Sequence, residues 1–447
     1  MRKRINNSDI HDVILRVVQD MFPSVKIGIF LETIDNCNLS SHIYIPYNVV
    51  NNKPDEKKDT FGLKLETSGS IRSKDAKKFL STLPDLVFLS YQEGIDLKGC
   101  GINARFKGLI NYLSIDDKLV VNELLSRLCL SKISNNLKDS VIKLIEFIRI
   151  VSNYRYEGKS PEISIILDLN NNKTNKNNYG TLNFDLIETN KGVLSICSNG
   201  AAALEVDING RITNIIPLHK NDNNNLFNVP ERLKQLANYS KIYKSIAINL
   251  DGSPSITFIA NGNCIFRFLN NKYIWVDTDL AISDLKNTII CNEIISLSCD
   301  MADIGHGGII VLVNDSDLIK DELRKIVNED CIPYLSNTWE SSVWENNASE
   351  RSRFNSWILK NNQIIADLPH SFLINIISID GATFIDSTNG KLMGFGAVVK
   401  VHEGSPDQGS RTTAAKFLSN KFGFVIKISE DKNAILFNNG EYACRIW

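Results

Sequence analysis

Short apolar runs separated by polar turns recur along the chain, and segments of helical periodicity stand between them. This pattern predicts an α/β protein. The expected strands span residues 26–32, 86–89, 163–169, 193–197, 201–206, 212–218, 245–250, 255–260, 264–269 and 309–313. The expected helices span residues 8–21, 75–83, 116–130, 136–153, 230–237, 280–301 and 318–327. Asn261-Gly262 stands between two of the strands and predicts a tight hairpin turn.

Three polar clusters interrupt the apolar pattern near the C-terminus: Asp380-Gly381-Ala382, Gly409-Ser410-Arg411 and Ser429-Glu430-Asp431. The first follows an apolar run of strand length at 372–379, and the third follows another at 424–428. The second opens a segment of helical character at 414–419. A carboxylate after a strand, and an arginine with a hydroxyl at a helix start, suit a metal-bound phosphate. The alternative is that the clusters are ordinary strand ends and a capped helix.

Two parts of the chain have matching patterns, which indicates an internal duplication. The segment that begins Asn199-Gly-Ala-Ala is similar to the one that begins Asp380-Gly-Ala-Thr, and residues 245–252 are similar to 424–431. In the first copy Asn199 replaces Asp380, and Leu250-Asp251 replaces Ser429-Glu430. An amide is a poor substitute for a carboxylate as a ligand of a hard metal or as a base. We therefore expect the first copy to be non-catalytic, unless the two units match only because strand–turn–strand units with Asn-Gly turns look alike.

Composition narrows the class of protein. The chain has 447 residues, 43% of them hydrophobic, which is enough for two or three domains with their own cores. A formal net charge of -1 provides no overall basic field to hold nucleic acid. The nine cysteines include no C-x-x-C pair, which favours reduced thiols in a cytoplasmic protein over a zinc site. No apolar run reaches the roughly 20 residues of a membrane helix, and the polar start predicts no signal peptide.

Taken together, the order and spacing of the C-terminal motifs resemble the diadenylate cyclase domain of the DNA-integrity-scanning protein and its relatives. The motifs are Gly307-Gly308-Ile309-Ile310, Asp380-Gly381-Ala382, Gly409-Ser410-Arg411-Thr412-Thr413-Ala414-Ala415 and Ile428-Ser429-Glu430. The resemblance implies a mixed, curved sheet flanked by helices. It also implies three parts: an N-terminal α/β region at 1–133, a degenerate cyclase-like or sensor domain at 134–279, and a diadenylate cyclase-like domain at 280–447.

The resemblance further implies a nucleotidyltransferase that condenses two ATP molecules into the second messenger cyclic di-AMP and releases pyrophosphate. Two such domains would face each other, so a homodimer or higher oligomer is expected. Asp380 and Glu430 match ligands of Mg²⁺ or Mn²⁺, and Asp380 and Arg411 match catalytic residues. The residues that match nucleotide-binding positions are Gly307, Gly308, Gly381, Ala382, Gly409, Ser410, Arg411, Thr412, Thr413 and Ser429.

One departure from the family pattern bears on activity. Thr412 and Thr413 stand where the family has His and Arg, so two groups that can carry positive charge are missing beside a polyanionic substrate. Lys416, about one turn further along the expected helix, is a candidate replacement. Two alternatives therefore stay open: a catalytically inactive sensor of a nucleotide or cyclic dinucleotide, and an interaction scaffold.

Overall fold

A computed structural model of the chain describes residues 25–30, 42–48, 60–67, 148, 151–152, 161–168, 182–183, 202–207, 211–218, 226, 229–252, 255–269, 272–276, 288–313, 364–399 and 409–447. These residues divide into two compact units. The first contains the described residues up to 219 together with 242–260 and 266–275. The second contains those within 220–241, 261–265 and 276–447. The elements expected at 8–21, 75–83, 86–89, 116–130, 193–197 and 318–327 lie outside the described residues.

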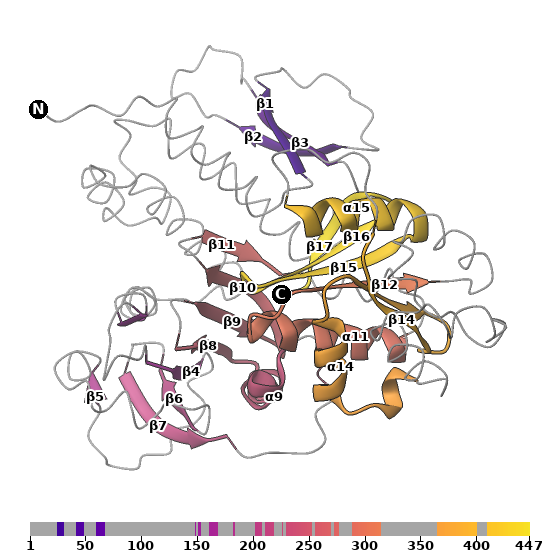
Figure 1. The fold of residues 1–447 in the computed structure, drawn as a ribbon. Coiled ribbons are helices and arrows are strands. Elements are labelled where there is room, and N and C mark those ends of the chain that lie inside the picture. Colours follow the sequence, from indigo (N-terminus) through magenta and orange to yellow (C-terminus); the bar gives the residue numbers. More distant parts are fainter. Residues whose placement is uncertain are drawn as a thin grey trace, which may run out of the picture. The chain divides into compact units, whose positions relative to one another are not determined.

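A three-stranded sheet of order β1-β3-β2 comes first in the chain (Figure 1). Its strands are β1 (Val25–Phe30), β2 (His42–Asn48) and β3 (Thr60–Thr67), and β3 pairs antiparallel with both neighbours. The strand expected at 26–32 is thus confirmed as β1, whereas the pattern had predicted neither of its partners.

An eight-stranded sheet of order β11-β10-β9-β8-β4-β6-β7-β5 follows. Its strands are β4 (Ile163–Leu167), β5 (Leu182–Asn183), β6 (Ala202–Val206), β7 (Arg211–Pro217), β8 (Ile246–Leu250), β9 (Ile256–Ala260), β10 (Asn263–Leu269) and β11 (Lys272–Trp275). A 3-10 turn, η2 (Glu231–Leu233), and the helix α9 (Lys234–Tyr243) precede β8. β4 and β6 run parallel, while β8 is antiparallel to both β4 and β9. Every strand expected between 201 and 269 is confirmed, and Asn261 and Gly262 adopt the positive φ angles of the expected hairpin turn.

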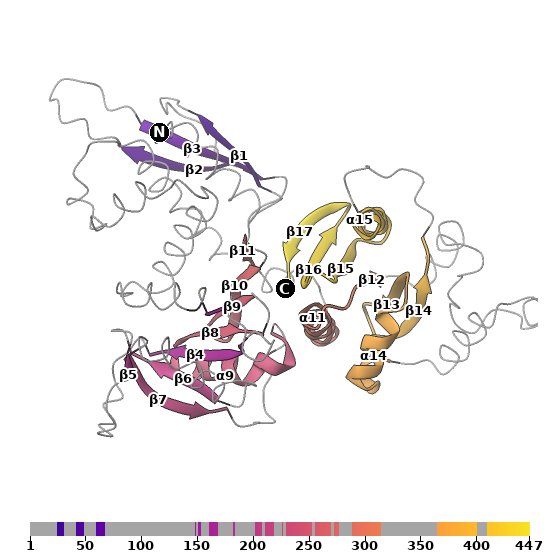
Figure 2. The same cartoon turned by 60° about the vertical axis from the view of Figure 1, so that its left-hand side comes forward.

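The C-terminal sheet has six strands in the order β14-β13-β12-β15-β16-β17 (Figure 2). They are β12 (Gly308–Val313), β13 (Ala382–Asp386), β14 (Leu392–Ala397), β15 (Phe424–Ser429), β16 (Asn433–Asn438) and β17 (Glu441–Arg445). The described helices of this part are α11 (Thr288–Asp303), η4 (Ile365–Asp367), α14 (His370–Ile377) and α15 (Ser410–Phe422). Both larger sheets are mixed, so the described part of the chain has the α/β character that the sequence predicts.

The two larger sheets share one connectivity. The order β7-β6-β4-β8-β9-β10 in the first corresponds to β14-β13-β12-β15-β16-β17 in the second. Each has one parallel pair, β4–β6 or β12–β13, flanked by antiparallel neighbours. A helical run ends just before β8 and before β15, and an Asn-Gly turn with positive φ follows β9 and β16. This is the arrangement that the predicted duplication requires.

The strand expected at 372–379 is wrong, and the error changes the position of Asp380. Residues 372–379 were expected to form a strand, but α14 occupies 370–377. Pro369 stands at the helix start, where a missing N–H costs nothing. The buried side chains Leu373, Ile376 and Ile377 follow helical spacing, which a continuous apolar run conceals. Asp380 consequently precedes a strand, β13, instead of following one.

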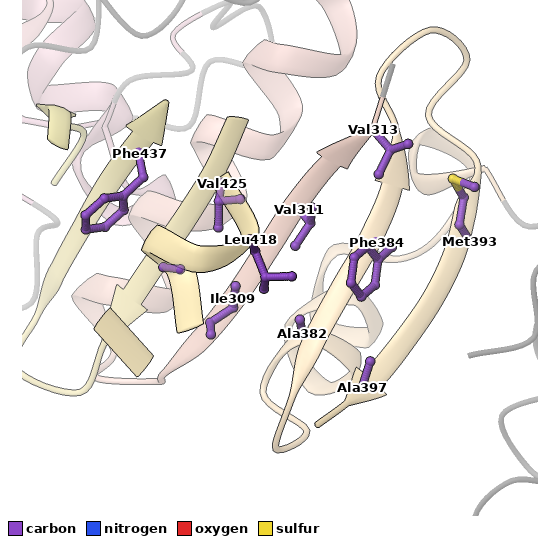
Figure 3. Packing of buried hydrophobic residues seen from close by; sticks show 11 residues of the cluster. Ile309, Val311, Val313, Ala382, Phe384, Met393, Ala397, Leu418, Val425 and Phe437 are labelled. Atoms are coloured by element: carbon purple, nitrogen blue, oxygen red, sulfur yellow. The ribbon is translucent and has the colours of Figure 1, made fainter. Parts of the chain in front are cut away.

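α15 packs against one face of the C-terminal sheet. Its buried residues Ala415 and Leu418 belong to a core cluster with Ile309, Val311 and Val425. Figure 3 shows Ile309, Val311 and Val425 near Leu418. The alternate residues of β12 point to the opposite face of the sheet, where a side chain at Gly308 would meet Ile377 of α14 and Met301 of α11. α15 therefore covers one face, while α11 and α14 cover the other. Among the described residues no helix has both the length and the apolar character that crossing a bilayer requires.

Candidate functional site

Strand register brings the C-terminal motifs to one edge of the sheet. β12 and β13 run parallel, with Ile309 opposite Ala382, so both begin at this edge. β15 runs the other way, with Gly308 opposite Ile428, so it ends there. Neighbouring strands lie about 4.8 Å apart. Gly307 is thus flanked by Asp380 on one side and by Ser429 on the other.

Arg411, in the first turn of α15, reaches the end of β15. Its Nη1 donates a hydrogen bond of 2.7 Å to Oε1 of Glu430. Both side chains are well exposed, at 41% for Arg411 and 67% for Glu430, so the pair stabilises the fold only slightly. The guanidinium also lies over Gly307, where an added Cβ would stand 2.4 Å from Nη1. Arg411 thereby joins the second motif to the third, and Gly307 is the residue that makes room for it.

Among the described residues, none covers the start of α15. No side chain caps it at Gly409, and Gly409 and Ser410 are exposed. The N–H groups of Thr412 and Thr413 both bond to the Gly409 carbonyl. The first N–H groups of a helix have no acceptor within the helix and carry partial positive charge. This start, with Arg411 beside it, is suited to bind an anion.

Two of the expected nucleotide-binding residues have roles inside the fold. Gly381 has φ +119, and an added Cβ would lie 2.5 Å from the carbonyl carbon of Gly396 and 2.6 Å from the nitrogen of Ala397. Close packing against β14 therefore explains this glycine without any ligand. Ala382 is fully buried in the core beneath α15, so packing accounts for this small residue as well.

The acidic residues at this edge differ in their surroundings. Asp380 is exposed, and Glu430 is engaged by Arg411. The described residues contain no group of three or more His, Cys, Asp or Glu side chains placed to hold a metal ion. Mg²⁺ at phosphate sites usually takes one or two carboxylates and completes its shell with phosphate oxygens and water. Asp380 and Glu430 therefore fit, in donor type and number, a metal that arrives with its nucleotide.

Lys427 is a further cation at this edge that the sequence pattern did not single out. It is half-buried on β15, opposite Ile309, on the face that α15 covers. Burial lowers the pKa of its ammonium from the ordinary value of 10.5, the neighbouring Asp431 raises it, and Arg411 and Arg445 lower it again. The charge at this edge is thus more positive than the motifs alone suggest.

The first copy has a counterpart of Arg411. η2 and α9 together run from Glu231 to Tyr243, as α15 runs from Ser410 to Phe422, and Arg232 is the second residue of its run, as Arg411 is of α15. The guanidinium of Arg232 binds both carboxylate oxygens of Asp303, with Nη2 to Oδ1 at 2.7 Å.

A second carboxylate, from Asp300, occupies the start of the same helical run. Its Oδ1 accepts a hydrogen bond of 2.7 Å from the N–H of Glu231, and its Oδ2 lies 2.8 Å from Nε2 of His370. Asp300 and Asp303 both end α11, where acidic side chains oppose the helix dipole. Two acidic residues at the end of an expected helix were the signal in the sequence that could have pointed to Asp300 and Asp303. All these residues belong to the second compact unit.

Of the two expected correspondences between the copies, the described residues include only the one at the end of β8. Asn199 lies outside the described residues. Leu250 pairs with Ile256, as Ile428 pairs with Ala434, so Leu250 matches Ile428 and Asp251 matches Ser429. The correspondence is shifted by one residue from the expected one, and Gly252 stands at the position of Glu430. Arg232 binds Asp303 of α11 instead.

His306, in the turn between α11 and β12, is exposed, and its Nδ1 lies 3.1 Å from Oγ of Ser378. This contact ties the turn to the end of α14.

Neither a scan against models of known protein families nor a search of curated proteins found a match to this chain.

Proposed function

We propose that residues 280–447 bind ATP with a divalent metal and join two ATP molecules into cyclic di-AMP. The observation that carries this proposal is the gathering of Gly307, Asp380, Arg411 and Glu430 at one sheet edge, next to an open helix start. A curved sheet of the diadenylate cyclase type, acting in the cytoplasm, is part of the proposal. Buried cysteines such as Cys299 and Cys444 suit that reducing compartment.

In this proposal the start of α15 and Arg411 hold the phosphates. To bind them, Arg411 exchanges the Glu430 carboxylate for a phosphate, which it can grip with the same fork of donors. Glu430, once released, is available to the metal, and the metal's role is to neutralise charge on the phosphates. Asp380 accepts the proton of the 3′-hydroxyl.

The 3′-oxygen of one ATP then bonds to the α-phosphorus of the other, and the bond from that phosphorus to the bridging oxygen breaks. Pyrophosphate leaves with the electron pair of that bond. Two such transfers close the ring, so two C-terminal domains must face each other, and we expect the active form to be a homodimer.

The first copy supports anion binding at the start of α15. Its equivalent helical run already holds two anions, the carboxylates of Asp300 and Asp303, through a backbone N–H and Arg232. The same kind of element therefore binds carboxylates in one copy and is left open in the other. A phosphate carries the charge and acceptor oxygens that would suit the open one.

A second candidate function is a sensor that binds the nucleotide without turning it over. The neutral side chains of Thr412 and Thr413, and the Arg411–Glu430 pair that must open, favour it. Loss of one charge partner of a transition state typically costs about 10²–10³ in rate.

Incubation of the purified protein with ATP and Mn²⁺, followed by detection of cyclic di-AMP, tests the proposal. We expect product from wild type and at least a 100-fold loss in Asp380→Asn, while Asp367→Asn, an exposed acid on η4, retains wild-type activity. ATP binding in calorimetry without product would identify a sensor. If neither ATP binding nor product is detected, both the enzyme and the sensor readings are refuted, and the interaction scaffold remains.

A further inference from the structure

Three cations gather beneath the start of α15. Lys427 and Arg445 both lie opposite Ile435, one from each side, so they share a face of the sheet. Ile435 packs against the core cluster that includes Ala415, which identifies this face as the one that α15 covers. Arg411 belongs to the first turn of that helix. The charges therefore come from three elements and converge on one place.

These cations have few acidic partners among the described residues. The carboxylate of Glu430 is bound by Arg411, and Asp431 is the acid that favours the charged form of Lys427. The Nε and Nη1 atoms of Arg445 are buried and have no hydrogen-bond partner there. A half-buried cation without full compensation is costly. A fold that keeps two of them beside an open helix start is arranged for an anion that is added from outside.

We propose that Lys427 and Arg445 extend the anion site of α15 and, with Arg411, hold the outer phosphates of a triphosphate. This inference rests on the proposed nucleotide-binding function and specifies which residues supply its charge. Lys427 takes this role in place of Lys416, which lies on α15 itself. A chain of three linked phosphates carries more charge and more acceptor oxygens than a single phosphate, so it can use all three cations.

Binding of inorganic tripolyphosphate, measured by calorimetry without metal, tests the proposal. We expect Lys427→Met to weaken binding about 10- to 100-fold, as loss of a charged hydrogen bond does. Lys416→Met should bind as wild type does. Because Lys427→Met removes a half-buried charge, its melting temperature should equal or exceed that of wild type.

The outcomes separate this inference from the proposed function. If wild type binds and Arg411→Gln weakens binding but Lys427→Met does not, this inference is refuted and the proposed function stands. If wild type binds neither tripolyphosphate nor ATP, the proposed function fails and takes the inference with it.

A measurement on wild type covers the case in which the variant does not fold. Tripolyphosphate should slow the acetylation of Lys427 by a small amine-reactive reagent and leave the acetylation of Lys416 unchanged. Mass spectrometry measures both. Equal labelling of Lys427 with and without tripolyphosphate would overturn the proposal.

Discussion

Asp303→Asn is the substitution that tests most directly how the helical run at 231–243 is held to the end of α11. The Asp303 side chain is 6% exposed and accepts two hydrogen bonds from Arg232. Asparagine keeps one acceptor oxygen but presents an amide N–H₂ to a donor of the guanidinium. The substitution therefore removes one charge-assisted bond, creates a donor–donor contact, and leaves the shape almost unchanged.

The size of the effect follows from this geometry. A hydrogen bond to a charged group contributes about 1.5–3 kcal/mol. Arg232 is 38% exposed, so water replaces part of what is lost, and the lower end of that range applies. We expect Asp303→Asn to lower the free energy of unfolding by about 2 kcal/mol, measured by urea denaturation.

A double-mutant cycle with Arg232→Gln isolates the pair from other effects. The coupling free energy should be about 1–2 kcal/mol, within the range found for residues in direct contact. Lys234→Gln, which removes the neighbouring ion pair with the exposed Glu231, is the matched control and should show no coupling to Asp303→Asn. Coupling below about 0.5 kcal/mol for the Arg232 pair would refute the idea that it fastens this segment.

Three further outcomes are expected. Gly307→Ala should displace the flexible end of Arg411, so ATP binding should change in calorimetry while stability falls by less than about 1 kcal/mol. Gly381→Ala should cost about 2–4 kcal/mol in urea denaturation, because its positive φ and the β14 backbone both resist a Cβ, whereas Gly409→Ala, which meets nothing within 4 Å, should be near neutral. Burial raises the pKa of Glu293, so the folded state keeps this proton to a higher pH than the unfolded state does. The stability that this group contributes should therefore fall as pH rises above 4.5. Glu293→Gln should lessen that fall in unfolding curves taken between pH 4 and 7, and an identical slope for wild type and variant would contradict this.

The sequence pattern located β1, β4, β12, β15 and the strands from β6 to β10, because alternation and Asn-Gly turns are local signals. It did not locate β13, β14, β16 or β17. It failed at 372–379, since a run such as Phe-Leu-Ile-Asn-Ile-Ile satisfies helix and strand periodicity alike. Length alone favoured a strand there, and only packing against the sheet decides for α14. β2 and β3 were missed as well, although they are consecutive strands that pair with each other.

The candidate site was predictable in part for a related reason. Motif order indicated that Asp380, Arg411 and Glu430 belong together, and register places them at one edge. Lys427 gave no such signal, because a lysine within a strand is most often solvated. Its meaning depends on which face α15 covers and on where β17 brings Arg445, which are long-range properties.

In each of the two copies an arginine at the second position of a helical run binds an acid, but the acid comes from a different place. In the second copy Glu430 is exposed and belongs to the adjoining strand end, so a phosphate can displace it. In the first copy Asp303 is nearly buried and Asp300 holds the helix start as well. Displacement there would break two sets of contacts at once. Duplication would thus have left one anion site open to exchange and used the other to fasten the helix to α11.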